Sequence, residues 1–384
     1  MEGVGFVRGF VVLGCLAMVA VCGGAPKRAA KPKVEEPNEF RIIVQANFAR
    51  WDLNHDQLLD AAEINHWVSR RGTSQPEAAA LVMLERHRPK KSEETANLSQ
   101  PDLMAVAEKG GGVREYKKTL ADIRAVNHAL FLPGDPGLAN FHQGAVGDCY
   151  LMSVIGSFVH RNPATLRAML QVSANGEVAA RFGNGRTISV AQPTDAEIVL
   201  NRRKDGEKHG MWLSALEKAY GTIRQDKKER ETGVSLAGAS TKELVGHGGL
   251  MGPVVEALTG HRSERGQISR WYKESPEKAM QELHGLLSRL EAEHRIAAMG
   301  SLGDKAVPIA KGIPRNHAFG FLGYDSARRM VRVFNPWGNE FMPSGTAGSV
   351  NGYVTHGGVC EIPVADLPHL FGAIAYETGK DLAK

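Results

Sequence analysis

One glycine-rich turn constrains the fold of this chain more than any other segment. Residues 143–150 read Gln-Gly-Ala-Val-Gly-Asp-Cys-Tyr, and a stretch with helical apolar spacing follows at once. The residues with this spacing are Leu151, Val154, Ile155 and Phe158. A helix must therefore begin close to Cys149 and bury one face in a core. Unpaired N–H groups and the dipole at a helix N-terminus stabilise a thiolate, so Cys149 is placed as a candidate nucleophile with a lowered pKa.

The cysteine content excludes a disulfide framework. Two of the four cysteines, Cys15 and Cys22, fall in an N-terminal stretch typical of an export signal, which leaves Cys149 and Cys360. With 384 residues, of which 42% are hydrophobic, the chain can form two or three units that each have a core. The net charge is only +5 and the basic residues are scattered, which argues against nucleic acid as a partner.

The N-terminal region predicts export. Residues 1–25 contain Arg8, then an apolar run from 10 to 21 that is too short to span a membrane, then small residues. Residues 26–38 are Pro-rich and charged, as in a solvated linker. We expect a periplasmic, extracellular or lipid-anchored protein, with Cys22 as the candidate lipidation residue.

The remaining chain divides by pattern into three segments. Residues 39–110 have helical periodicity and predict a small all-α domain, 111–135 form a connecting segment, and 136–378 mix helix and strand. In the connecting segment a helix is expected near 113–131. The elements expected after it are helices at 149–161 and 211–222, a hairpin of strands 318–324 and 330–334, a strand near 359–362, a short helix from 365 and a strand near 373–376.

A calcium loop is predicted between two of the N-terminal helices. The twelve residues 52–63 carry oxygen-bearing side chains at the EF-hand positions 1, 3, 5, 9 and 12, and position 7 adds a backbone carbonyl. The ligands expected for Ca²⁺ are Asp52, Asn54, Asp56, Leu58, Asp60 and Glu63. Position 6 is Gln57 instead of the usual Gly, so a non-glycine residue at positive φ should weaken the affinity. An acidic surface turn is the alternative interpretation.

A second loop is expected because EF-hands usually occur in pairs. Residues 91–102 repeat the layout of the first loop, with Leu98 matching Leu59, but Lys91 at the first position would repel the ion. The segment predicts a degenerate loop that pairs with the first without binding calcium. A polar connection between two helices explains it equally well.

Two distant motifs supply partners for Cys149. Residues 316–319 (Asn-His-Ala-Phe) precede one hairpin strand and 334–338 (Phe-Asn-Pro-Trp-Gly) end the other, so the hairpin should bring His317 and Asn335 together. The Asn carbonyl can then accept the ring N–H and select one tautomer, and Trp337 can cover that hydrogen bond. The side-chain amide of Gln143 and the backbone N–H of the Cys can bind an oxyanion. A nucleophile, an acid-base and an orienting group are thereby assigned.

The motifs QGAVGDCY, MWLSALEKAYG, EALTG, NHAFGF and NPWG, in this order, resemble the calpain family of cysteine peptidases over residues 136–378. The resemblance implies an α+β, papain-like two-lobed fold, here preceded by the small all-α EF-hand domain, with substrate in a cleft between the lobes. It also implies that Gly248, Gly249 and Trp337 contact the substrate. Tyr150 departs from the family, which usually has Trp there.

The leading functional prediction is an endopeptidase that cleaves protein or peptide substrates through a Cys149 thioester. Calcium could gate activity or only brace the fold, and the sequence leaves this open. A catalytically silent, calcium-responsive binding protein is one alternative. A transglutaminase-type acyl transferase is another, although that class normally uses Asp as the orienting group where this chain has Asn335. The oligomeric state is not indicated.

Overall fold

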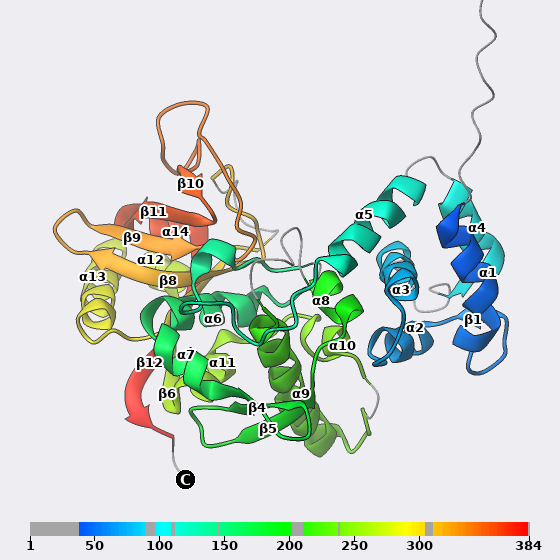
Figure 1. Ribbon diagram of the computed structural model, residues 1–384. Helices are drawn as coiled ribbons and strands as arrows, with labels where there is room; N and C mark the ends of the chain where they lie inside the picture. Colours follow the sequence, from blue (N-terminus) through cyan, green and yellow to red (C-terminus); the bar gives the residue numbers. More distant parts are fainter. Residues whose placement is uncertain are drawn as a thin grey trace, which may run out of the picture. The chain divides into compact units, whose positions relative to one another are not determined.

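A helical part opens the region that the computed structural model describes. The described residues are 38–88, 97–108, 112–144, 146–201, 210–236, 239–303 and 310–382. By its internal contacts the chain from Asn38 onward forms one unit (Figure 1). The predicted export signal, Cys22 and residues 26–37 of the predicted linker lie outside the described residues, whereas Asn38, the last linker residue, is described. None of the described helices combines the length and the apolar character that a membrane crossing requires.

The N-terminal helices pack around one shared hydrophobic cluster. Helix α1 (Glu39–Trp51) begins where the Asn38 side chain accepts a hydrogen bond from the Arg41 N–H, and it buries the face predicted from its periodicity. Ala196 and Val199 of the later helix α8 (Asp195–Asn201) complete the same cluster. The other helices of this part are α2 (Ala61–Val68), α3 (Gln75–His87), α4 (Gln100–Glu108) and α5 (Gly112–Arg124).

Helix α5 is shorter than the sequence predicts, because the expected helix at 113–131 ends at Arg124. Just beyond it, the Asn127 side-chain oxygen accepts a hydrogen bond from the N–H of Ala129 at 2.9 Å. A short polar side chain that captures a nearby backbone N–H competes with helix continuation, and the chain turns there.

The second part surrounds the predicted nucleophile helix, α6 (Cys149–Arg161). Its apolar face lies in a hydrophobic cluster with helices α9 and α11 and with an antiparallel three-stranded sheet in the order β3-β4-β5. Helix α9 extends well past the expected 211–222. The bounds are α7 (Pro163–Met169), β3 (Leu170–Val172), β4 (Glu177–Arg181), β5 (Thr187–Ala191), α9 (Trp212–Thr232), α10 (Thr241–Val245) and α11 (Met251–Thr259), with a 3-10 turn η1 at Leu138–Asn140.

The third part is an antiparallel seven-stranded sheet in the order β10-β11-β9-β8-β7-β12-β6. Its strands are β6 (His261–Gly266), β7 (Ala297–Ser301), β8 (Ala318–Asp325), β9 (Met330–Phe334), β10 (Thr355–His356), β11 (Val359–Pro363) and β12 (Phe371–Asp381). Helices on this part are α12 (Ile268–Glu274), α13 (Pro276–Ala292) and α14 (Leu367–Leu370), with a 3-10 turn η3 at Val364–Asp366. The expected hairpin 318–324/330–334 is confirmed as β8 and β9.

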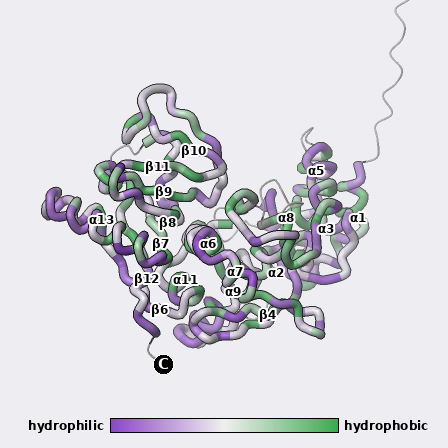
Figure 2. Tube along the Cα trace, turned by 60° about the vertical axis from the view of Figure 1, so that its left-hand side comes forward, coloured by the Kyte–Doolittle hydropathy of each residue, from purple (hydrophilic) through white to green (hydrophobic). Residues whose placement is uncertain are grey.

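The large sheet separates two hydrophobic clusters. Helix α6 packs on β8 from one side, where the Ser157 hydroxyl donates to the carbonyl of Phe321 at 2.7 Å. Helix α13 packs on β8 as well, and its leucines belong to a different cluster with α12 and α14. Figure 2 shows purple and green stretches alternating along the helices around the sheets, as two-sided elements require. Residues 136–378 thus have the mixed helix and strand architecture that the sequence predicts.

Candidate active site

Cys149 is the first residue of α6, and a close backbone contact fixes the turn before it. The Gly147 carbonyl accepts a hydrogen bond from the Gly248 N–H at 3.1 Å, and Gly147 forms a parallel bridge with His247. A Cβ on Gly147 would lie 2.3 Å from the carbonyl oxygen of Gly246. Only glycine therefore allows the two backbones to approach so closely.

The predicted partners of Cys149 meet at the ends of the hairpin. His317 precedes β8 and Asn335 follows β9, and the His317 Nε2–H donates to Asn335 Oδ1 at 2.8 Å. The same oxygen accepts from the backbone N–H of Trp337 at 3.0 Å, and the Trp337 ring centre is 4.3 Å from the imidazole centre. The backbone N–H of His317 donates to the Ser301 hydroxyl at 3.0 Å, which fixes the chain at this residue. The imidazole itself is held by the Asn335 side chain and covered by the Trp337 ring.

Glycines set the spacing between α6 and the hairpin. A Cβ on Gly320 of β8 would lie 2.5 Å from the Ser153 carbonyl oxygen of α6, and a Cβ on Gly156 would lie 2.7 Å from the Phe334 ring. The backbone N–H of Ala318, the residue after His317, hydrogen-bonds the Cys149 thiol. The packing of helix on strand thus brings the thiol to the start of β8, next in the chain to the imidazole.

Burial disfavours the charged form of both candidate catalytic groups. It lowers the pKa of His317 to about 4, against the smaller opposing effect of the Asn335 hydrogen bond. Burial also raises the pKa of the Cys149 thiol, which the Ala318 N–H only partly offsets. The sequence predicts a lowered thiol pKa from the helix N-terminus, whereas burial shifts this pKa in the opposite direction because removal of water disfavours the thiolate.

Gln143 is buried and its side chain differs in orientation from the sequence expectation. Its Nε2 donates to the Val146 carbonyl at 2.6 Å, inside the turn, and its backbone N–H donates to the Pro336 carbonyl at 2.7 Å. The amide that was expected to face an oxyanion is occupied by the turn. Gln143 instead ties the turn before Cys149 to the segment that follows Asn335.

Sequence reasoning did not single out Asp148, which is the N-cap residue of α6. Its side chain is 0% exposed and lies near those of Glu217, which is 2% exposed, and Gln143. Burial raises the pKa of Asp148 to about 6, and the neighbouring Glu217 and Gln143 side chains lower it in part. Two buried carboxyl groups in contact are satisfied when they share a proton. The sequence signal that could have identified Asp148 is that it is the one charged residue among residues 143–150.

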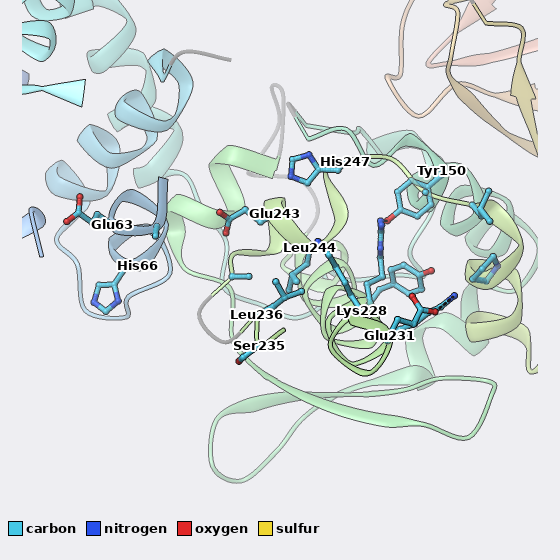
Figure 3. Close-up of a pocket in the computed structure, with 18 of the residues that line it drawn as sticks. Glu63, His66, Tyr150, Lys228, Glu231, Ser235, Leu236, Glu243, Leu244 and His247 are labelled. Atoms are coloured by element: carbon cyan, nitrogen blue, oxygen red, sulfur yellow. Dashed lines mark hydrogen bonds and ion pairs between the residues drawn. The ribbon is translucent and has the colours of Figure 1, made fainter. Parts of the chain in front are cut away.

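Gly248 and Gly249 lie beside the turn and the first helical residues of α6. Gly248 has a φ of 73°, in the left-handed region that favours glycine, and a Cβ on Gly249 would lie 2.6 Å from the Tyr150 ring. Tyr150 and Gly249 are among the residues that line the pocket drawn in Figure 3. Trp337, the third residue expected to contact substrate, is 38% exposed.

The predicted calcium loop curls around two buried carboxylates. Asp52 accepts hydrogen bonds from the N–H groups of Asp56 and Gln57 at 3.2 and 2.8 Å, and Gln57 has the positive φ expected at position 6, 67°. Glu63 accepts from the N–H groups of Leu53, Asn54 and Asp60 at 2.7 to 3.1 Å. Among the described residues no group of three or more His, Cys, Asp or Glu side chains is placed to hold a metal ion.

The loop forms a short sheet with the second, degenerate segment. Strand β1 (Leu58–Leu59) pairs antiparallel with β2 (Leu98–Ser99). Leu59 lies opposite Leu98, the residue at the equivalent position when the second loop of the sequence is aligned with the first. Residues 91–96 of the second segment lie outside the described residues. Asp60 caps α2 through a reciprocal pair of hydrogen bonds with Glu63.

Comparison with known proteins assigns the family. No curated protein matches the chain. The sequence model of one family, described as calpain family cysteine protease, matches residues 121–346, which is more than half of the chain. The matched residues contain the turn before α6, the helix itself and the hairpin that carries the histidine and the asparagine. The chain belongs to the calpain family of cysteine proteases.

Proposed function

We propose that this protein is a cysteine endopeptidase that hydrolyses peptide bonds of protein substrates through a thioester on Cys149. The observation that carries the proposal is the 2.8 Å hydrogen bond from His317 Nε2–H to Asn335 Oδ1, on a hairpin packed against the helix that begins with Cys149. Family membership supports peptidase chemistry, and this hydrogen bond supports the roles that we propose for the individual residues.

In the proposed mechanism His317 acts through its other ring nitrogen. Because Asn335 Oδ1 accepts a hydrogen bond from the Nε2–H, the ring carries its proton on Nε2, and Nδ1 keeps a lone pair that can take the proton of the Cys149 thiol. The thiolate attacks the peptide carbonyl carbon, and the backbone N–H of Cys149 stabilises the oxyanion. The imidazolium then protonates the leaving amine as the C–N bond breaks. Water attacks the thioester with His317 as base, which releases the acid and restores the thiol.

The neutral resting pair has a consequence for the proposed cycle. Burial disfavours both the thiolate and the imidazolium, so the charged pair forms only when substrate contacts stabilise it. The Gln143 amide, which donates to the Val146 carbonyl in the resting turn, would have to turn outward to serve as a second oxyanion donor. We therefore propose that substrate binding completes the site.

We propose that the catalytic region is divided into two lobes, as in papain-like folds, with the candidate site between them. One lobe consists of α6 and the cluster around α9 and α11, and the other consists of the large sheet with α12 to α14. Cys149 would belong to the first lobe, and His317 and Asn335 to the second. Gly248, Gly249 and the partly exposed Trp337 would contact the substrate backbone and side chains in the cleft.

We also propose that residues 52–63 form a calcium-binding EF-hand. Support comes from the positive φ of Gln57 and from the β1–β2 pairing of Leu59 with Leu98. The ligands would be Asp52, Asn54, Asp56, Asp60, Glu63 and the carbonyl of Leu58. Bound calcium would supply charge that draws these oxygens together and would stabilise the domain. Terbium luminescence should detect binding by the intact protein, and Asp52→Ala should weaken it at least tenfold; equal binding would exclude the loop.

The N-terminal sequence supports a proposal of export, with residues 1–25 as the signal and Cys22 as the lipidation candidate. The intact mass of the protein recovered from cells tests it directly. The mass of a chain that starts after residue 25 indicates simple cleavage. The mass of a chain that starts at Cys22, increased by that of a lipid, indicates anchoring, and the mass of the full-length chain refutes the proposal.

The peptidase proposal is tested by covalent labelling with a peptidyl epoxide. Wild type should be labelled at Cys149 and should cleave a denatured protein substrate, while Cys149→Ala abolishes both activities. His317→Ala should lower the rates at least a hundredfold. Cys360→Ser is the matched control, since Cys360 is buried with a pKa raised to about 12, and it should leave both rates unchanged.

The same experiment separates the alternatives. A folded wild-type protein that is neither labelled nor active would refute the peptidase and favour a binding protein. Release of ammonia from glutamine side chains without cleavage of the chain would identify an acyl transferase. Addition of chelator distinguishes calcium gating, which stops labelling, from bracing, which only lowers the unfolding temperature.

A further inference from the structure

Arg224, on helix α9, contacts two segments of the candidate site, the start of helix α6 at Tyr150 and the glycine segment at Gly248. Its Nη1 donates to the carbonyl of Gly248 at 2.8 Å and also to the hydroxyl of Tyr150. Its guanidinium carbon lies 5.2 Å from the centre of the Tyr150 ring. One side chain therefore joins the glycine segment to the residue that directly follows Cys149.

Two hydrogen bonds hold Gly248, one on each of its peptide groups. Its N–H, in the peptide before its Cα, donates to the Gly147 carbonyl, and its carbonyl, in the peptide after its Cα, accepts from Arg224. Gly248 has a φ of 73°, so this residue has unusually wide conformational freedom when it is not held. The hydrogen bond from Arg224 therefore decides where the segment points.

The Tyr150 ring forms the surface against which Gly249 packs. Because a Cβ at Gly249 would approach the ring to 2.6 Å, the backbone lies directly on the aromatic face. The Tyr150 hydroxyl in turn contacts Arg224. Sequence reasoning missed the Tyr150–Arg224 contact because the partners belong to different helices.

The contacts of Arg224 that the structure describes are with a hydroxyl, a carbonyl and an aromatic ring, and none of these is a carboxylate. Both hydrogen bonds leave Nη1 of a planar guanidinium, whose donors point in fixed directions, whereas the three donors of an ammonium group rotate freely. Arg224 is therefore used for its shape as much as for its charge.

We propose that Arg224 is a positioning residue that holds Gly248 and Gly249 against the nucleophile helix, so that a substrate backbone lying on these glycines is in register with Cys149. The inference rests on the proposed peptidase function and concerns how the substrate is placed. Arg224 itself touches no reacting atom. Its loss should therefore weaken substrate binding more than it slows the chemical step.

The test compares Arg224→Met, Arg224→Lys and Tyr150→Phe with wild type on a peptide substrate. Arg224→Met should raise KM at least tenfold and change kcat less than threefold, and Arg224→Lys should recover only part of the loss. Tyr150→Phe should raise KM about three- to fivefold. In the double variant Arg224→Met/Tyr150→Phe the effects should not multiply, because both remove one contact. Arg230→Met, an exposed arginine on the same helix, is the matched control and should leave KM unchanged.

Two outcomes overturn the inference. One is an unchanged KM in Arg224→Met together with a lower unfolding temperature, which means that the contact only stabilises the fold. The other is a fall in kcat at constant KM, which means that Arg224 acts on the chemical step.

A wild-type protein that cleaves no peptide refutes the proposed function, and the inference is then decided by amide hydrogen exchange over residues 246–250. Faster exchange in Arg224→Met than in Arg230→Met supports the positioning role, and equal exchange overturns it.

Discussion

Replacing Gly320 with alanine should separate the nucleophile helix from the strand that carries the histidine. The added Cβ would lie 2.5 Å from the Ser153 carbonyl oxygen and 3.3 Å from the Ser157 nitrogen. Both atoms belong to the backbone of α6, so no side chain can rotate away. Ordinary contact begins at 3.4 Å, and α6 must therefore move by about 0.9 Å relative to β8.

This displacement gives expected magnitudes for stability and activity. Overpacking at such a contact costs about 1–3 kcal/mol of unfolding free energy. A shift of about 1 Å between catalytic groups lowers the rate by about a hundredfold. Gly320→Ala should therefore remain folded in urea titrations but lose about two orders of magnitude in kcat/KM on a peptide substrate.

Gly285→Ala is the matched control for this experiment. Gly285 lies within α13, and no atom stands within 4 Å of its hypothetical Cβ. Alanine at that position should stabilise the helix by about 0.5–1 kcal/mol and leave the activity unchanged. A Gly320→Ala protein with wild-type stability and activity would show that the spacing of α6 and β8 is not fixed by this glycine.

Three other predictions concern stability, each measured by urea unfolding. The pKa of His317 falls from 6.5 to about 4 on folding, so the neutral imidazole stabilises the fold above pH 6.5. Between pH 7.5 and 4.5 the wild-type protein should therefore lose about 2–3 kcal/mol of unfolding free energy that His317→Gln does not lose, and parallel pH profiles would contradict the shift. Asp148 should give the opposite pH dependence, since its pKa rises from 3.8 to about 6 on folding. Relative to Asp148→Asn, the wild-type protein should lose about 2 kcal/mol of unfolding free energy as the pH rises from 4.5 to 7.5, and a constant difference would mean that the carboxyl group near Glu217 does not titrate in this range. Asp60→Ala removes the cap of α2 and should cost about 0.5–2 kcal/mol without calcium, whereas an unchanged midpoint would show that Glu63 alone suffices.

The sequence predicted the parts of the site whose geometry is local. The helix from Cys149 and the hairpin that joins His317 to Asn335 follow from apolar period and from short connections, and the structure contains both. The apolar pattern did not predict that α5 would end at Arg124 instead of near residue 131, because the Asn127 hydrogen bond just after the helix depends on the conformation of one side chain.

The sequence could not predict the interactions between distant segments. The contact of Arg224 with Tyr150 and the proximity of Asp148 to Glu217 each join two helices whose relative placement depends on the whole core. The lowered thiol pKa expected for Cys149 differs in direction from the effect of its burial for a related reason, since the helix terminus is visible in sequence but the burial is not. The Gln143 side chain likewise depends on the exact path of its turn.

The order of the large sheet bears on when the enzyme first becomes competent during synthesis. Strand β12 follows both candidate catalytic segments in the chain, yet it lies between β7 and β6, and β7 is the neighbour of the strand that begins after His317. Until β12 emerges from the ribosome, β6 has no partner and β7 has an open edge, so the sheet beneath His317 is incomplete. Pairing of such distant segments is slow because a long loop must close first. The nascent polypeptide would therefore be protected from its own active site until synthesis has passed β12.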